Sequence, residues 1–198
     1  MNITEHYNSL LHTGSDIHEH LPTLKQYASE CEHVTEMGVR GAVSTWAFLE
    51  GKPKRLVCID INLCPLEEAE RLANEAGIEF KFIQADTANP DLHIESTDLL
   101  FIDTYHIYDQ LKVELKLHPK HVRKYIIMHD TTAFADVGER RDLYVDSNLL
   151  ISPEQPDSPR GLWAAIEEFL HENPSWILKE RYTNNNGLTV LERVSAES

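Results

Sequence analysis

Acidic residues and glycines at the ends of apolar runs are the first sign of chemistry in this chain. Residues 36–46, EMGVRGAVSTW, lead from an apolar run through a turn into a helix, and the next apolar run ends at Asp60. Gly38 and Gly41 allow the backbone to approach a ligand, and the start of the helix offers free N–H groups. A carboxylate at the tip of the following strand can accept hydrogen bonds from two ribose hydroxyls. The pattern therefore predicts a site for a nucleoside-containing cofactor.

The composition of the turn indicates which cofactor this is. A pyrophosphate needs the three glycines of G-x-G-x-x-G, whereas this turn has two and carries Arg40. Glu36, at the end of the first strand, would repel a phosphate and suits an ammonium group. S-adenosylmethionine has a ribose, an ammonium group and no phosphate, so we expect it to be the cofactor. Ser44 and Thr45 are expected to hydrogen-bond this cofactor, to cap the helix, or to do both.

Carboxylates and imidazoles also stand at or just beyond the ends of the later apolar runs. They are Asp86, Asp103, His106, His129 and Asp130. Asp103 and Asp130 each have a histidine close by in the sequence, and both follow predicted strands. Two carboxylates with flanking imidazoles predict a metal-binding or acid–base site.

The spacing of apolar residues predicts strands and helices in alternation. Expected strands are residues 34–37, 55–60, 79–83, 98–102 and 125–128, and expected helices are residues 17–31, 42–50, 65–76, 108–117 and 162–171. Alternating units of this length indicate an α/β fold with a doubly wound parallel sheet and functional groups at the carboxyl ends of its strands. The Asn-Gly turn at residues 184–187, between two β-rich runs, predicts a final antiparallel hairpin.

Parts of the sequence without such a pattern receive more general assignments. Residues 131–160 contain three prolines and no apolar periodicity, which predicts a lid or substrate loop. Several histidines have no second potential metal ligand at a suitable spacing in the sequence, and they are expected at the surface: His12, His18, His20, His93, His118 and His121.

The composition limits the class of protein. A chain of 198 residues is expected to form one domain, with an N-terminal helical segment over residues 1–31. The formal net charge of −15 argues against binding to nucleic acid, and no apolar run is long enough to cross a membrane. Cysteines without a C-x-x-C pair and the lack of a signal-peptide pattern predict a cytoplasmic protein with reduced thiols. Oligomeric state stays open, and a homo-oligomer is compatible with the sequence.

Motifs along most of the chain occur in a recognisable order. They are EMGVRGAVSTWAF, CIDIN, QADT, DLLFIDTYHIYDQLKVEL, IIMHDT, RGLWAAIEEFL and NNNGLTVLER, over roughly residues 15–193. Together they resemble the class I S-adenosylmethionine-dependent methyltransferases, and among these the cephalosporin-hydroxylase-like group, which includes metal-dependent O-methyltransferases of macrolide sugars. The resemblance implies a Rossmann-like sheet of seven strands, mostly parallel, with a C-terminal antiparallel hairpin.

The resemblance also implies roles in cofactor binding. Glu36, Gly38 and Gly41 correspond to the loop around the methionine part of the cofactor. Asp60 corresponds to the acid that binds the ribose, and Asp86 to the acid that binds the adenine amino group. These assignments agree with the chemistry expected from the residues themselves.

A second set of implied roles concerns a divalent metal. In the sugar methyltransferases, an Asp at the position of Asp103 and an acidic pair at the position of His129 and Asp130 hold Mg²⁺. A histidine at the position of His106 serves as the base, and Asp103 is also expected beside the cofactor. The chain departs from this pattern at His129, where the family has Glu. Imidazole is a better ligand for softer metals than for Mg²⁺, so the choice between Mg²⁺ and Mn²⁺, and the need for a metal, stay open.

These expectations lead to an S-adenosylmethionine-dependent O-methyltransferase with His106 and Asp103 as catalytic residues. The expected partner is a small hydroxylated acceptor, such as a sugar. Binding to nucleic acid or to a membrane is not expected. One alternative is a nicotinamide-dependent α/β oxidoreductase, against which the missing third glycine and the terminal hairpin count. Another is a catalytically silent cofactor-binding protein, against which Asp103, His106 and Asp130 count.

Overall fold

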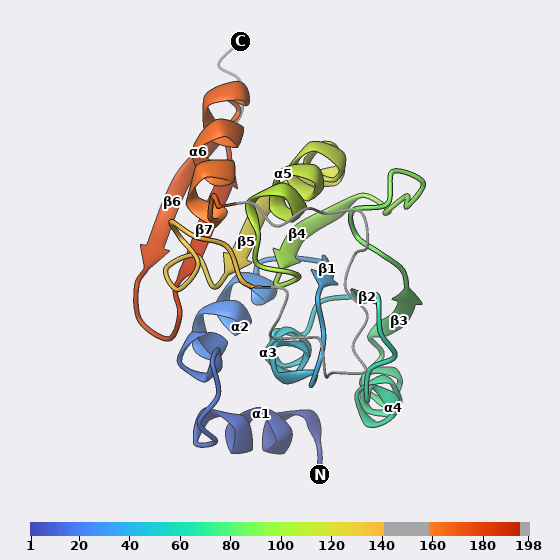
Figure 1. Cartoon of the computed structure of the whole chain (residues 1–198). Helices are drawn as coiled ribbons and strands as arrows, with labels where there is room; N and C mark the ends of the chain where they lie inside the picture. The colour runs from blue at the N-terminus through green and yellow to red at the C-terminus, as the bar shows by residue number, and fades with distance from the viewer. Residues whose placement is uncertain (141–158, 195–198) are drawn as a thin grey trace.

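A computed structural model describes residues 1–140 and 159–194 of the chain. One sheet lies between two layers of helices (Figure 1). The helices are α1 (Ile3–Leu11), α2 (Leu21–Ser29), α3 (Val43–Glu50), α4 (Glu67–Glu75), α5 (Tyr108–Leu117) and α6 (Leu162–Glu172), with 3-10 turns η1 (His18–His20) and η2 (Pro119–His121). The strands are β1 (His33–Met37), β2 (Arg55–Asp60), β3 (Glu79–Gln84), β4 (Thr97–Ile102), β5 (Val122–His129), β6 (Trp176–Tyr182) and β7 (Leu188–Arg193).

The sheet has seven strands in the order β3-β2-β1-β4-β5-β7-β6. Strands β1 to β5 pair in parallel, whereas β7 runs antiparallel to both β5 and β6. The strand order reverses between β1 and β4. In open α/β sheets, ligands bind at the point of reversal, just outside the carboxyl ends of the strands. The predicted Rossmann-like sheet, mostly parallel with a C-terminal antiparallel hairpin, is confirmed.

Apolar side chains on both faces of the sheet form two cores. Along β4, Leu99 and Phe101 enter the core that includes residues of α1 to α4, and Leu100 and Ile102 enter the core that includes residues of α5 and α6. Phe48 of α3 packs edge-on against Phe101, with ring centroids 5.3 Å apart. Because both faces of a parallel sheet are covered, its central strands are buried along their length, as β4 is.

The N-terminal segment differs from the single helix predicted over residues 17–31. The chain instead forms α1, the 3-10 turn η1 and then α2. Asn2 and Glu5 form a reciprocal capping box at the start of α1, a sequence signal that the prediction missed. Pro22 lies in the first turn of α2, where its missing N–H costs nothing, so a new helix begins there.

Two of the histidines predicted at the surface are buried. His20 and His118 are each 1% exposed, so the prediction was wrong for both. Each ring is hydrogen-bonded to a backbone carbonyl. His20 Nε2 lies 2.9 Å from the oxygen of Asn184, and His118 Nε2 lies 2.7 Å from the oxygen of Thr87. Burial lowers the pKa of both imidazoles, and a neutral ring that donates to a carbonyl can be buried at little cost.

The predicted lid over residues 131–160 falls largely on residues 141–158, which lie outside the described residues. Its first part, residues 131–140, continues from β5, and backbone N–H groups of Thr132 and Ala133 donate to the oxygen of Asn186 in the hairpin turn. Within the described part of the chain, each helix is too short or too polar to cross a membrane.

Candidate functional site

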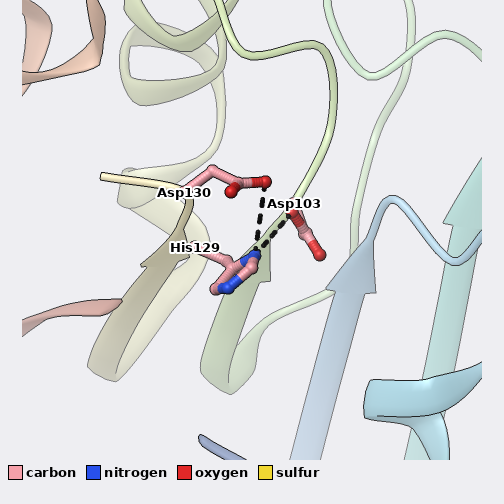
Figure 2. Close-up of side chains that lie close together, drawn as sticks. All are labelled: Asp103, His129 and Asp130. Carbon is pink, nitrogen blue, oxygen red and sulfur yellow. Dashed lines mark hydrogen bonds and ion pairs between the residues drawn. The ribbon is translucent and has the colours of Figure 1, made fainter. Parts of the chain in front are cut away.

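The carboxyl ends of β1, β4 and β5 bring three segments of the chain to one edge of the sheet. The register aligns the last residue of β1 with the last residue of β4, and that residue with the penultimate residue of β5. Asp103, directly after β4, therefore lies beside His129 and Asp130 at the end of β5. Figure 2 shows these three side chains pointing toward one another above the strand ends.

The loop after β1 packs against the segment that carries Asp103. Gly38 has a φ of 83°, and a Cβ at this position would lie 2.0 Å from the backbone oxygen of Asp103. Glycine is therefore required, both for the backbone conformation and for the close approach of the two segments. Gly41 is different, because a Cβ there would meet no atom of residues 1–140 and 159–194 within 4 Å. Among these residues, the space beside Gly41 is open to a ligand.

Asp60 holds this loop in shape. Its Oδ2 accepts hydrogen bonds from the N–H groups of Val39 at 2.8 Å and Arg40 at 3.1 Å, and its Oδ1 accepts one from Asn62 N–H at 2.8 Å. The thiol of Cys64 also bonds to the Asp60 carboxylate, so most of its acceptor sites, about four in a carboxylate, have partners within the protein. Asp86 stands apart, beyond β3, where its Oδ1 accepts from the N–H of Ala88 at 2.9 Å.

Glu36 lies beneath the loop and is fully buried. Its carboxylate accepts hydrogen bonds from the hydroxyls of Ser44 and Thr45 and from the thiol of Cys58. Burial raises the pKa of Glu36 to about 7, although the three hydrogen bonds oppose that rise. Of the two roles expected for Ser44 and Thr45, capping of α3 was wrong, because the N-cap is Ala42 and no side chain of the described residues caps this helix.

Asp103, His106, His129 and Asp130 form a group that we call the acid–imidazole cluster. His106 Nε2 lies 3.1 Å from Asp103 Oδ1 and 3.0 Å from Asp130 Oδ2. His129 Nδ1 lies 3.3 Å and 3.4 Å from the same two oxygens. Each carboxylate oxygen is thus shared by two imidazole nitrogens, and the sequence prediction that these residues converge is confirmed by the geometry.

Glu139 is a member of the site that the sequence did not indicate. His106 Nδ1–H donates to Glu139 Oε2 at 2.8 Å, while Phe134 stacks on the imidazole with ring centroids 5.1 Å apart and parallel planes. The backbone N–H of Glu139 also donates to the oxygen of His106 at 2.8 Å. A carboxylate on Nδ1 orients the ring so that Nε2 faces Asp103 and Asp130, as in acid–histidine pairs of hydrolases.

The charges in the cluster stabilise one another. Burial alone would lower the pKa of His106, but hydrogen bonds to Asp103, Asp130 and Glu139 raise that pKa well above its usual range. Burial also opposes protonation of His129, yet the attraction of the Asp103 carboxylate raises the pKa of His129 to about 10. Despite their burial, the pKa values of Asp103 and Asp130 are held well below the usual range by the two imidazoles.

The residues present fit a divalent cation. Asp103, His129 and Asp130 each offer one ligand atom, and these atoms all lie within 4.8 Å of one another. Asp130 Oδ1 is buried and finds no hydrogen-bond partner among the described residues, which is costly unless another group binds it. Two carboxylates and one imidazole form a donor set that divalent metals such as Mn²⁺ accept.

Known structures share this fold. No protein-family model matches the sequence, and no curated protein matches it. An SAH-bound methyltransferase from Podospora anserina aligns over 98% of this chain and 88% of its own, with 19% identity and a TM-score of 0.57. An O-methyltransferase from Bacillus cereus in complex with SAH aligns over 96% of this chain and 90% of its own, with 14% identity and a TM-score of 0.56.

A structure with a different acceptor atom aligns equally well. An N1-methyltransferase from Burkholderia thailandensis, bound to 1,6-didemethyltoxoflavin and S-adenosylhomocysteine, aligns over 92% of this chain and 80% of its own, with 12% identity and a TM-score of 0.58. The chain therefore has the fold of class I S-adenosylmethionine-dependent methyltransferases. That fold supports transfer to oxygen and to nitrogen, so the site residues must carry any finer assignment.

Proposed function

We propose that this chain is an S-adenosylmethionine-dependent methyltransferase acting on a hydroxyl oxygen of a sugar or another small polyhydroxylated molecule. The observation that carries the proposal is the direct contact between the loop after β1 and the acid–imidazole cluster, where Gly38 packs on the backbone of Asp103. The expected cofactor loop and the groups that can bind and deprotonate a hydroxyl are therefore neighbours. Proximity of this kind is the main source of catalysis in a methyl transfer.

Cofactor binding is assigned to residues at or beyond the carboxyl ends of β1 to β4 and in the first turn of α3: Glu36, Gly38, Gly41, Ser44, Thr45, Asp60, Asp86 and Asp103. When bound, S-adenosylmethionine supplies an activated methyl group on a sulfonium sulfur. The space beside Gly41, where a Cβ would meet no atom of the described residues within 4 Å, supports this assignment. Ser44 and Thr45 act through Glu36, because their hydroxyls donate to its carboxylate.

A divalent cation, Mg²⁺ or Mn²⁺, is assigned to Asp103, His129 and Asp130. When bound, it supplies positive charge that lowers the pKa of an acceptor hydroxyl. Asp130 Oδ1, which has no hydrogen-bond partner among the residues that the structure describes, and the short distances between the ligand atoms support the assignment.

His106 is assigned the role of proton acceptor. Its Nε2 faces the carboxylates, and Glu139 accepts the Nδ1 hydrogen at 2.8 Å, so the nitrogen without a hydrogen in the neutral ring is Nε2. The carboxylates around the ring stabilise its imidazolium and raise its pKa, so His106 could take a proton only with a cation on Asp103 and Asp130 to offset their charge. Phe134 covers one face of the ring and limits its rotation.

The alternatives find less support. A dinucleotide-binding sheet has the order 3-2-1-4-5-6, whereas here β7 is inserted between β5 and β6, and the loop after β1 lacks the third glycine. A cofactor-binding protein without activity would not require the acid–imidazole cluster, whose buried charges are costly to assemble.

Calorimetry with S-adenosylhomocysteine and with NADH tests the cofactor. We expect the first to bind and the second not to bind, and the opposite result would favour the oxidoreductase. A screen of sugars and other polyols, with release of S-adenosylhomocysteine as the signal and Mg²⁺, Mn²⁺ or EDTA present, then tests the reaction. Turnover on amines alone would overturn the assignment to oxygen, and full activity in EDTA would overturn the metal.

A further inference from the structure

The turn of the C-terminal hairpin, Asn184–Gly187, lies against the candidate metal site. We infer that this turn is a positioning element of the site and that its backbone determines which nitrogen of His129 faces Asp103 and Asp130. The inference rests on the proposed metal role of these three residues. It assigns a function to a segment that the sequence identified only as a turn.

The contact is made through the outer nitrogen of His129. Its Nε2–H donates to the backbone carbonyl of Asn185 at 3.1 Å, and a carbonyl can only accept. Since Nε2 keeps its hydrogen, Nδ1 is the nitrogen that can bind a cation, and Nδ1 faces Asp103 and Asp130. The side chain of His129 is 1% exposed, so water has little access to compete for the carbonyl.

The turn has an unusual backbone that directs this carbonyl inward. Asn185, Asn186 and Gly187 have φ values of 44°, 69° and 96°, three consecutive residues in the left-handed region that most residues avoid. The oxygen of Asn186 accepts hydrogen bonds from two successive N–H groups just after Asp130, each at 2.9 Å. A Cβ on Gly187 would lie 2.3 Å from Thr132 Oγ1. The turn is therefore held closely against the segment that follows the metal ligands.

The N-terminal segment holds the other side of the turn. Asn185 Oδ1 accepts from the N–H of Glu19 at 2.9 Å, and Asn185 Nδ2 donates to the oxygen of Ser15 at 3.0 Å. His20 Nε2 bonds the oxygen of Asn184 at 2.9 Å, and its ring meets the ring of His129 edge-on at 5.7 Å. A hairpin alone needs none of these contacts. They link residues 15–20 to the metal site through a single turn.

Asn185→Gly tests the inference with little disturbance of the backbone. Glycine adopts the left-handed conformation freely and keeps the carbonyl, so the variant removes only the two side-chain bonds to the N-terminal segment. We expect the dissociation constant for Mn²⁺, measured by electron paramagnetic resonance of free Mn²⁺, to rise about 10-fold or more, the usual effect of loosening a group that holds a metal ligand. Affinity for S-adenosylhomocysteine should be unchanged. Asn89→Gly is the control, because Asn89 is an exposed turn residue whose Oδ1 accepts from a backbone N–H.

Nuclear magnetic resonance of histidine-labelled wild-type protein gives a second measurement, which does not depend on a variant. In the Zn²⁺-loaded protein, His129 should carry its hydrogen on Nε2. A hydrogen on Nδ1, or an unchanged Mn²⁺ affinity in Asn185→Gly, would overturn the inference while leaving the metal site intact. Failure of the wild type to bind Mn²⁺ would overturn both the inference and the metal assignment on which it rests.

Discussion

Replacing Glu36 by Gln should remove a large part of the pH dependence of stability. Glu36 is fully buried, and burial raises its pKa from the ordinary 4.5 to about 7. Between these two values the unfolded chain has lost the proton while the folded chain still holds it. The wild type is therefore most stable below pH 4.5 with respect to this group, and it loses that stability as the pH rises toward 7.

The size of the effect follows from the two pKa values. Each unit of pKa corresponds to about 1.4 kcal/mol, so the full contribution of Glu36 is about 3 kcal/mol, of which about 2.5 kcal/mol falls between pH 5 and pH 8. Gln has a similar shape and no proton to lose in this range. The hydroxyls of Ser44 and Thr45, which now donate to Glu36, can each donate to or accept from the amide.

Urea unfolding at pH 5 and pH 8 provides the measurement. The free energy of unfolding of the wild type should fall by about 2.5 kcal/mol more than that of Glu36→Gln between these pH values. Subtracting the change measured for Glu36→Gln from the change measured for the wild type removes the contributions of the other titrating groups. One of these is Glu114, because burial also raises its pKa to about 7. Glu70→Gln, in an exposed position of α4, controls for the loss of a negative charge. Equal pH dependence in the wild type and Glu36→Gln would refute the reasoning.

Three further predictions concern the site. Asp103→Asn and Asp130→Asn should each weaken Mn²⁺ binding by more than about 100-fold, since even groups that only hold a ligand contribute 10- to 100-fold. Calorimetry should show unchanged S-adenosylhomocysteine affinity in Asp130→Asn, and retained Mn²⁺ binding in either variant would exclude that ligand. His106→Ala should keep cofactor and metal but slow turnover by about 10²- to 10⁴-fold, and an unchanged rate would exclude it as the base. Gly38→Ala should lower the free energy of unfolding by about 2–4 kcal/mol, because the added Cβ meets the backbone of Asp103. Gly41→Ala is the control and should unfold like the wild type. A melting curve of Gly38→Ala equal to that of the wild type would contradict the prediction.

The order of elements could be predicted because it depends on local patterns. The strand at residues 55–60 and the helix at residues 108–117 were predicted with the bounds that the structure has, since apolar periodicity, Gly and Pro act over a few residues. The N-terminal segment was predicted less well. There the apolar spacing continues across Pro22, which begins α2, and the contact that holds η1 before it, between His20 and the hairpin turn, is one that the spacing does not show.

The candidate ligands could be predicted because the carboxyl ends of parallel strands meet at one edge of a sheet. This rule placed Asp103 beside His129 and Asp130 without knowledge of any distance. It could not identify Glu139, which lies 33 residues beyond His106 in a segment without periodicity. Nor could it show that the carbonyl of Asn185 orients His129, because a backbone oxygen carries no signal in the sequence.

The sequence by itself determined the alternation of strands and helices, the terminal hairpin and the residue types that gather at the strand ends. Only the tertiary structure decided what each of those side chains does there. Glu36 and Asp60 were both expected to face a cofactor, and the structure adds that Glu36 is buried and accepts from three donors and that Asp60 holds the loop after β1. The physical reason is that periodicity depends on neighbours along the chain, whereas burial and hydrogen bonding depend on segments that meet only after folding.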